Sequence, residues 1–142
     1  MKKVVLDTNV TVSALFWDGN PRKIYDLVRH GKLIMLLSDD MEKEFIRVLG
    51  YEKFGLSPQE IMPFVRNLRT HARHVKTKSK ISIVTVDPTD NIFLECALDG
   101  GANSIISGDR HLHDLEVYKG IEIVSAKEFL SKEGLPGEER DK

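Results

Sequence analysis

Acidic residues that follow short apolar segments are the main chemical feature of this sequence. Each apolar segment is expected to form a buried strand, so the acid after it would lie near the strand's carboxyl end. Several carboxylates in one pocket repel each other, and a divalent cation such as Mg²⁺ relieves that repulsion while accepting phosphate oxygens. Such a cation can activate a water molecule and stabilise charge on a phosphoryl group. The candidate metal-binding and catalytic residues are Asp7, Glu44, Asp90 and Asp109.

Each acid also has a structural interpretation. Asp7 could begin a turn, although its place after the wholly apolar run 4–6 favours a functional role. Asp87 is interpreted first as a helix N-cap. Asp90 would then be the third residue of that helix, where a carboxylate suits the helix dipole. Asp109 could serve a Gly-Asp turn, so the convergence of the set, rather than any single acid, indicates a site.

The elements that must position these acids alternate between strand and helix. The predicted strands are 4–6, 33–37, 81–86, 104–106 and 121–124. The predicted helices run from an Asn20 N-cap to Gly31, from a Ser38 cap to Gly50, from a capping box at Ser57, from Asp87 through Leu98, and from a Ser125 cap. This alternation predicts an α/β fold whose parallel sheet is covered on both faces. Ligands of such sheets bind beyond the carboxyl ends of the strands.

Four segments of the chain resemble, in order, the motifs of PIN-domain nucleases. They are Val4-Val5-Leu6-Asp7-Thr8-Asn9, the segment 38–49 around Glu44, Asp87-Pro88-Thr89-Asp90 continuing to Ala97, and Ile105-Ile106-Ser107-Gly108-Asp109 continuing to Leu112. Helical periodicity does not choose between Glu42 and Glu44, and the resemblance selects Glu44. The match extends from residue 4 to about 130 and is most similar to toxin components of bacterial and archaeal toxin–antitoxin pairs.

The resemblance implies a three-layer α/β/α sandwich with a central, mostly parallel sheet. It further implies Mg²⁺ or Mn²⁺ as cofactor, hydrolysis of RNA phosphodiester bonds, and the four acids as metal ligands, directly or through water. Thr8 and Asn9 would support the site by orientation and hydrogen bonding. Two acids depart from the family pattern, Asp87 three residues before Asp90 and Asp114 after Asp109, and both are expected to support the site. The expected partners are RNA, a cognate antitoxin protein and a second copy of the chain.

A basic stretch is the candidate surface for nucleic acid. The net charge of −1 provides no global field that attracts RNA. From Arg66 to Lys80, however, the chain has six Lys or Arg residues and no acid. A solvated helix face and loop is one interpretation and phosphate contact is the other. The candidate substrate-binding residues are Arg66, Arg69 and Arg73.

Length and composition predict a single globular unit. With 142 residues, the chain is expected to form a nuclease domain over residues 1–131 and a flexible polar tail over residues 132–142. The single cysteine, Cys96, favours a reducing compartment. The apolar runs are too short for a transmembrane helix or a signal peptide, so a cytoplasmic location is expected.

Two other enzyme classes and a signalling class compete with this interpretation. Asp7-Thr8-Asn9-Val10-Thr11 nearly matches the first motif of haloacid-dehalogenase-type phosphatases, but Asn9 replaces the second acid and an amide cannot act as a general acid. A PIN-domain nuclease that processes RNA without being a toxin is the second alternative. A response-regulator receiver needs two adjacent early acids, and here the early acid, Asp7, stands alone.

Overall fold

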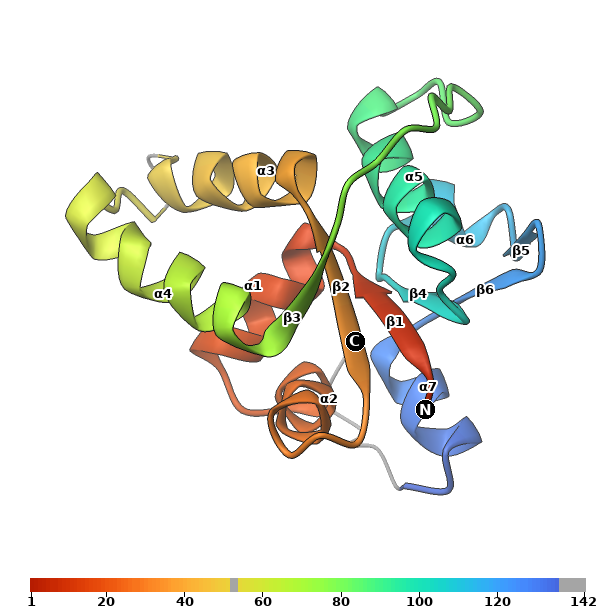
Figure 1. The fold of residues 1–142 in the computed structure, drawn as a ribbon, viewed down its shortest axis with the longest axis horizontal. Coiled ribbons are helices and arrows are strands. Elements are labelled where there is room, and N and C mark those ends of the chain that lie inside the picture. Colours follow the sequence, from red (N-terminus) through yellow and green to blue (C-terminus); the bar gives the residue numbers. More distant parts are fainter. Residues whose placement is uncertain (52–53, 136–142) are drawn as a thin grey trace.

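A six-stranded sheet forms the centre of the protein, which is described by a computed structural model covering residues 1–51 and 54–135 (Figure 1). The strand order is β3-β2-β1-β4-β6-β5, and every neighbouring pair is parallel except β5 and β6. The strands are β1 (Lys3–Leu6), β2 (Ile34–Ser38), β3 (Ala72–Val75), β4 (Ser104–Ile106), β5 (Val117–Tyr118) and β6 (Ile121–Val124).

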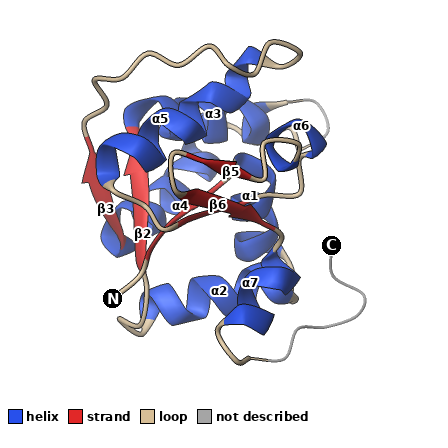
Figure 2. Ribbon diagram, turned by 90° about the vertical axis from the view of Figure 1, so that its right-hand side faces the viewer, coloured by secondary structure: helices blue, strands red, loops and turns tan. Residues whose placement is uncertain are grey.

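Helices cover both faces of this sheet. Helix α5 packs against β1, β2 and β4, and α2 and α7 lie on the opposite side (Figures 1 and 2). Helix α1 contacts α2 and α3, and α4 runs along α3 and β3. The helices are α1 (Thr8–Phe16), α2 (Asn20–Arg29), α3 (Asp39–Gly50), α4 (Pro58–His71), the 3₁₀ turn η1 (Pro88–Asp90), α5 (Asn91–Gly100), α6 (Arg110–His113) and α7 (Ala126–Lys132). The predicted α/β sandwich with a mostly parallel sheet is confirmed.

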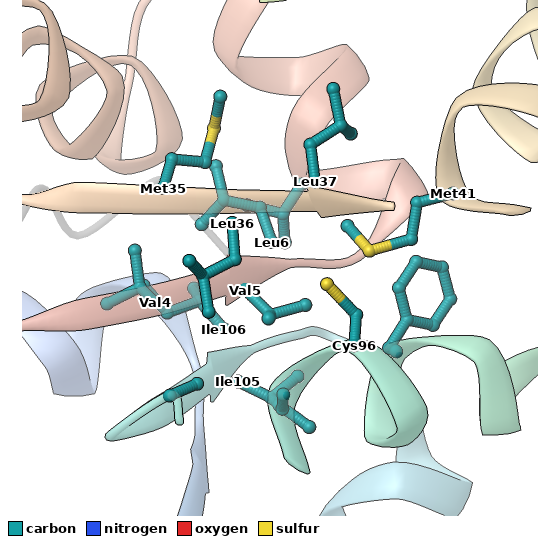
Figure 3. Close-up of a cluster of buried hydrophobic side chains, with 14 of the residues drawn as sticks. Val4, Val5, Leu6, Met35, Leu36, Leu37, Met41, Cys96, Ile105 and Ile106 are labelled. Carbon is teal, nitrogen blue, oxygen red and sulfur yellow. The ribbon is translucent and has the colours of Figure 1, made fainter. Parts of the chain in front are cut away.

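The core forms around the central strand β1. Val4, Val5 and Leu6 each expose 1% or less of their surface, as a strand covered on both faces requires. Figure 3 shows this strand packed among apolar side chains of β2, β4 and α5. Because β1 and β4 are neighbours within this dense core, the residues that follow them are held close together.

The predicted helix starts agree with the structure at three serines. The Ser38 hydroxyl accepts a hydrogen bond from the Met41 N–H at 3.3 Å and caps α3. Ser57 and Ser125 each begin a full capping box, at α4 and α7. Helix α5 ends at Gly100, where a Cβ would stand only 2.6 Å from Leu36 Cδ1, so the helix packs directly on β2.

The third predicted strand is wrong. Residues 81–86 are irregular, and the strand beside β2 is β3, which lies within the predicted basic stretch. The irregular segment is attached to α5 by side chains instead of strand pairing. Asn91 accepts from the Val84 N–H at 3.0 Å and donates to the Val84 carbonyl at 2.8 Å. An apolar run alone does not distinguish a paired strand from a segment whose backbone groups bind side chains.

Helix α1 was absent from the sequence prediction. Its residues are apolar or β-branched on most sides, so no amphipathic period marks it. At α2 the N-cap is Gly19 rather than Asn20, which is the first helical residue and is buried. The short elements α6 and β5 were also not predicted.

Two further expectations concern the C-terminal tail and the presence of a membrane-spanning helix. The predicted flexible tail begins at Lys132, which is the last residue of helix α7, and residues 136–142 of that tail lie outside the described residues. Among the described residues, no helix is both long and apolar enough to cross a membrane.

Candidate active site

A pocket of about 210 Å³ at the carboxyl edge of the sheet contains most of the predicted site residues. Its lining consists of Asp7, Thr8, Asn9, Glu44, Arg47, Val48, Asp87, Thr89, Asp90, Phe93 and Asp109. The four candidate metal ligands, which are far apart in the sequence, therefore share one cavity with three of the four predicted supporting residues. The structure brings them together as the strand-end argument requires.

Asp7 connects β1 to α1 at the base of this pocket. One carboxylate oxygen accepts a hydrogen bond from the Val10 N–H at 2.8 Å and caps α1, and the other accepts from the Ser107 hydroxyl. Only 5% of the residue is exposed. Burial raises the pKa of this carboxyl, and the charge of Asp109 raises it further, against the lowering effect of its hydrogen bonds. Asp7 therefore combines a structural contact with a place in the pocket.

Ser107 joins the acids that follow β1 and β4. Its buried hydroxyl donates to Asp7 and accepts from the Asp109 N–H at 2.9 Å. The Asp109 side chain in turn accepts from the N–H groups of His111, at 2.8 Å, and Leu112, at 3.1 Å, which begin α6. Sequence reasoning did not select Ser107. The available signal was a small hydroxyl residue between a strand and a candidate metal ligand.

Asp90 contains the one buried side-chain oxygen or nitrogen atom that lacks a hydrogen-bond partner among the described residues. The residue is 6% exposed, and its Oδ2 is buried without a hydrogen-bond partner. Burial, the charge of Asp109 and a side-chain hydrogen bond with Asp109 raise the pKa of Asp90 to about 7, with smaller contributions from Asp87 and Asp7. A carboxyl oxygen without a donor, on a group whose ionisation the neighbouring acids oppose, is a position that a cation would stabilise.

Glu44 and Glu42 bind different partners in the structure, although helical periodicity does not distinguish them. Glu44 lines the pocket and binds Arg47 through two hydrogen bonds, Nε to Oε1 at 2.8 Å and Nη2 to Oε2 at 2.6 Å. The bond to Glu44 raises the pKa of the Arg47 guanidinium. Glu42 instead binds Arg69 from α4, with Nε to Oε2 at 3.0 Å, outside this pocket.

The predicted substrate-binding arginines and Asp114 are not part of the pocket lining. Arg69 lies with Glu42 in a separate hollow between α3, α4 and β3. Arg66 on α4 and Arg73 on β3 are exposed. Asp114 follows α6 and is also exposed. The basic residue that does line the pocket is Arg47, which sequence reasoning passed over because it belongs to no basic run.

Asp87 has the capping role that was predicted for it. Its side chain accepts from the Thr89 N–H at 3.2 Å and begins the turn η1. It also lines the pocket, so its charge contributes to the local negative field. The residue thus shapes the turn that presents Asp90.

The donor set suits a hard divalent cation. Within residues 1–51 and 54–135, no three acidic, histidine or cysteine side chains already surround one point as a metal-binding group. Protein donors hold these carboxylates instead, as Arg47 does for Glu44 and Ser107 for Asp7. The unpartnered Asp90 oxygen and the all-oxygen character of the acids nevertheless fit Mg²⁺ or Mn²⁺, which bind a few carboxylates and retain waters.

Comparison with known families agrees with this geometry. The family described as PIN domain matches residues 3–111, which is well over half of the chain. Comparison with curated proteins gives no match. The matched region contains every strand and helix that contributes to the pocket.

Proposed function

The chain belongs to the PIN-domain family, and from this membership we propose that it is a metal-dependent endoribonuclease. PIN domains are generally nucleases, that is, hydrolases acting on nucleic acid, and they typically use divalent metals. The finer proposal is that this chain cleaves RNA with Mg²⁺ or Mn²⁺. The residues proposed to hold the cation, directly or through water, are Asp7, Glu44, Asp90 and Asp109.

One observation carries this proposal: Asp90 keeps an unpartnered carboxylate oxygen within a pocket of other acids. Burying such a group costs folding free energy, because desolvation and like charges both oppose its ionisation. A purely structural acid would have acquired a donor, as other acids of this chain have. The arrangement is explained if the missing partner is a ligand of positive charge.

The protein groups around the cation site have separable tasks. Val10 and Ser107 hold the Asp7 carboxylate in one orientation, and the start of α6 holds that of Asp109. When bound, a divalent cation stabilises charge on the phosphoryl group and lowers the pKa of a coordinated water. Because these carboxylates are fixed, they define where the cation would lie relative to the substrate phosphate. Thr8 and Asn9, at the pocket wall, are proposed to orient the neighbouring acid and the bound water.

The biological role proposed for this activity is that of a toxin in a toxin–antitoxin pair. The support is the resemblance of the motif sequence to that group of PIN proteins. A cognate antitoxin protein would then be the partner, and a homodimer is the proposed assembly. A processing nuclease of the same family would use the same pocket. A phosphatase of the haloacid-dehalogenase type is less well supported, since Asn9 lines the pocket where that chemistry requires an acid.

Cleavage of a single-stranded RNA oligonucleotide blocked at both ends tests the proposal. We expect internal cleavage with Mg²⁺ or Mn²⁺, none with excess chelator, and no hydrolysis of a chromogenic phosphate monoester. A DNA oligonucleotide of the same sequence serves as the comparison for substrate class. Full cleavage in excess chelator, or phosphatase activity without nuclease activity, would contradict the assignment.

A further inference from the structure

Arg47 is the only lysine or arginine among the pocket-lining residues in the described part of the chain. Its guanidinium binds both oxygens of Glu44, so a cation bound at Glu44 would compete with Arg47 for the same carboxylate. The Glu44 side chain is 15% exposed, whereas the Arg47 side chain is 47% exposed. The arginine therefore stands at the solvent side of the pocket, where a substrate would arrive.

Tyr51 supports Arg47 from the side. The guanidinium carbon lies 4.4 Å from the centre of the Tyr51 ring, and Tyr51 itself is 52% exposed. An arginine stacked on an aromatic face keeps its planar N–H groups available at its edge. Those groups match a phosphate as well as a carboxylate, because both accept two parallel hydrogen bonds.

We propose that Arg47 is a substrate-binding residue that exchanges partners, from Glu44 in the metal-free protein to an RNA phosphate in the loaded protein. The inference rests on the proposed nuclease function. The Arg47 guanidinium would be repelled by a divalent cation next to Glu44 and would bind that carboxylate less tightly. The released guanidinium, kept nearby by Tyr51, then donates to a phosphate at the pocket entrance. Arg47 thus balances the charge of Glu44 until a cation takes that role, and it then binds the substrate phosphate.

Helix α2 contains a comparable ion pair, Arg29 with Asp26, that lies outside the carboxylate pocket. Arg29 binds Asp26 with the same spacing of three residues, and its guanidinium carbon lies 5.8 Å from the centre of the Tyr25 ring. Arg29 lines a different hollow, between α1, α2 and α4, which has no acidic residue in its lining. Arg29→Ala therefore removes an equivalent surface ion pair without touching the carboxylate pocket.

The first test measures two affinities that should move in opposite directions in Arg47→Ala. Mn²⁺ affinity, measured by calorimetry on the protein without RNA, should rise because Glu44 is released. Affinity for a cleavage-resistant RNA oligonucleotide in Mn²⁺ should fall about ten- to a hundredfold, and the salt slope should shrink by about 0.7 for one lost phosphate contact. Arg47→Lys, which keeps the charge without the bidentate geometry, should lie between wild type and alanine. Arg29→Ala should match wild type in both measurements.

The second test removes the competing carboxylate. In Glu44→Gln without metal, RNA affinity should rise, since the guanidinium is no longer held by a charged partner. Adding Arg47→Ala to that variant should abolish the gain. A gain that persists in the double variant would show a general effect of removing negative charge, and would overturn the proposal.

The outcomes separate this inference from the function on which it rests. If the wild-type protein neither binds Mn²⁺ nor cleaves RNA, the proposed function fails. If wild type does both, and Arg47→Ala keeps RNA affinity and salt slope unchanged, only the inference fails, because Arg47 would then be a counter-ion alone. A circular dichroism melt of each variant identifies losses of affinity that are caused by unfolding. If Arg47→Ala is unfolded, the Mn²⁺ and RNA affinities of Arg47→Lys decide whether the inference holds.

Discussion

Two acids inside the pocket and two acids elsewhere on the surface respond to the fold in opposite ways. Asp7 and Asp90 are buried, and their pKa values are raised, mainly by burial. The pKa of Asp39 is lowered, first by its hydrogen bond with His74. The pKa of Asp99 is lowered by the Ser79 hydroxyl and by the N–H groups of Ser79 and Lys78. Folding thus favours ionisation of Asp39 and Asp99 and opposes that of Asp7 and Asp90.

This difference separates acids that maintain the fold from acids that await a ligand. An acid with lowered pKa contributes stability in its charged form, so its partners explain its presence. An acid with raised pKa destabilises the folded state when it ionises, and for Asp90, whose buried Oδ2 has no donor, folding alone gives no reason to keep it. A carboxyl pKa that is raised by burial and by like charges in a pocket is accordingly a stronger indicator of function in this chain than a lowered pKa.

Asp90→Asn should have the largest effect on activity. The substitution removes the charge and keeps the shape, so cleavage of RNA should fall by on the order of a hundredfold or more. The metal-free variant should melt at the same temperature as wild type or higher, because repulsion within the pocket is relieved. A rate assay and a thermal melt on the same sample check both statements. Loss of stability together with retained cleavage would place Asp90 among the structural acids.

Cation binding should stabilise the wild-type protein through the pocket alone. At a free Mn²⁺ concentration about 100 times Kd, linkage adds about 2.7 kcal/mol to the free energy of unfolding. For a domain of this size, that corresponds to a rise in melting temperature of about 5–10 °C. Asp90→Asn should lose most of this rise, and Asp99→Asn should retain it. Equal responses of the two variants would mean that the cation binds elsewhere.

The pH dependence of stability in the metal-free protein should show the contribution of Asp90. This residue holds its proton up to a pKa of about 7 in the folded state, whereas its ordinary value is 3.8. Its stabilising contribution is therefore complete below the unfolded value and is lost as the pH rises through about 7. Asp39 and Asp99, whose pKa values are lowered, act oppositely and lose their contribution as the pH falls below the ordinary range.

Urea unfolding between about pH 4.5 and about pH 8 checks this dependence. In wild type the free energy of unfolding should decline across that interval, and in Asp90→Asn the decline should be much smaller. Identical slopes for the two proteins would contradict the assignment of the raised pKa to Asp90.

The smallest effect is expected from a substitution in the capping box of helix α7, which lies outside the pocket. Ser125 and Glu128 form the capping box of α7, and the N–H of Ser125 lowers the pKa of Glu128. Ser125→Ala should destabilise the protein by about 1 kcal/mol and leave the cleavage rate of the folded protein unchanged. Chemical denaturation and a rate assay test this pair of statements. A large loss of cleavage at full folding would extend the functional region to α7.

Several features followed from the sequence alone because they depend on neighbouring residues. The run 4–6 ending in Asp7 indicated a buried strand with an acid at its carboxyl end, and that strand is β1. The capping serines marked the starts of α3, α4 and α7. Alternation of strands and helices predicted a parallel sheet, whose strand ends collect residues at one edge whatever their spacing in the chain.

Only the tertiary structure decided which groups satisfy one another. Glu42 and Glu44 are equivalent by periodicity, and they differ because Arg69 reaches the first while Arg47 and the pocket surround the second. Residues 81–86 resemble a strand, but hydrogen bonds to the Asn91 and Glu95 side chains of α5 hold them as an irregular segment. Pairing and burial depend on distances between segments remote in the chain, and local sequence patterns contain no such distances.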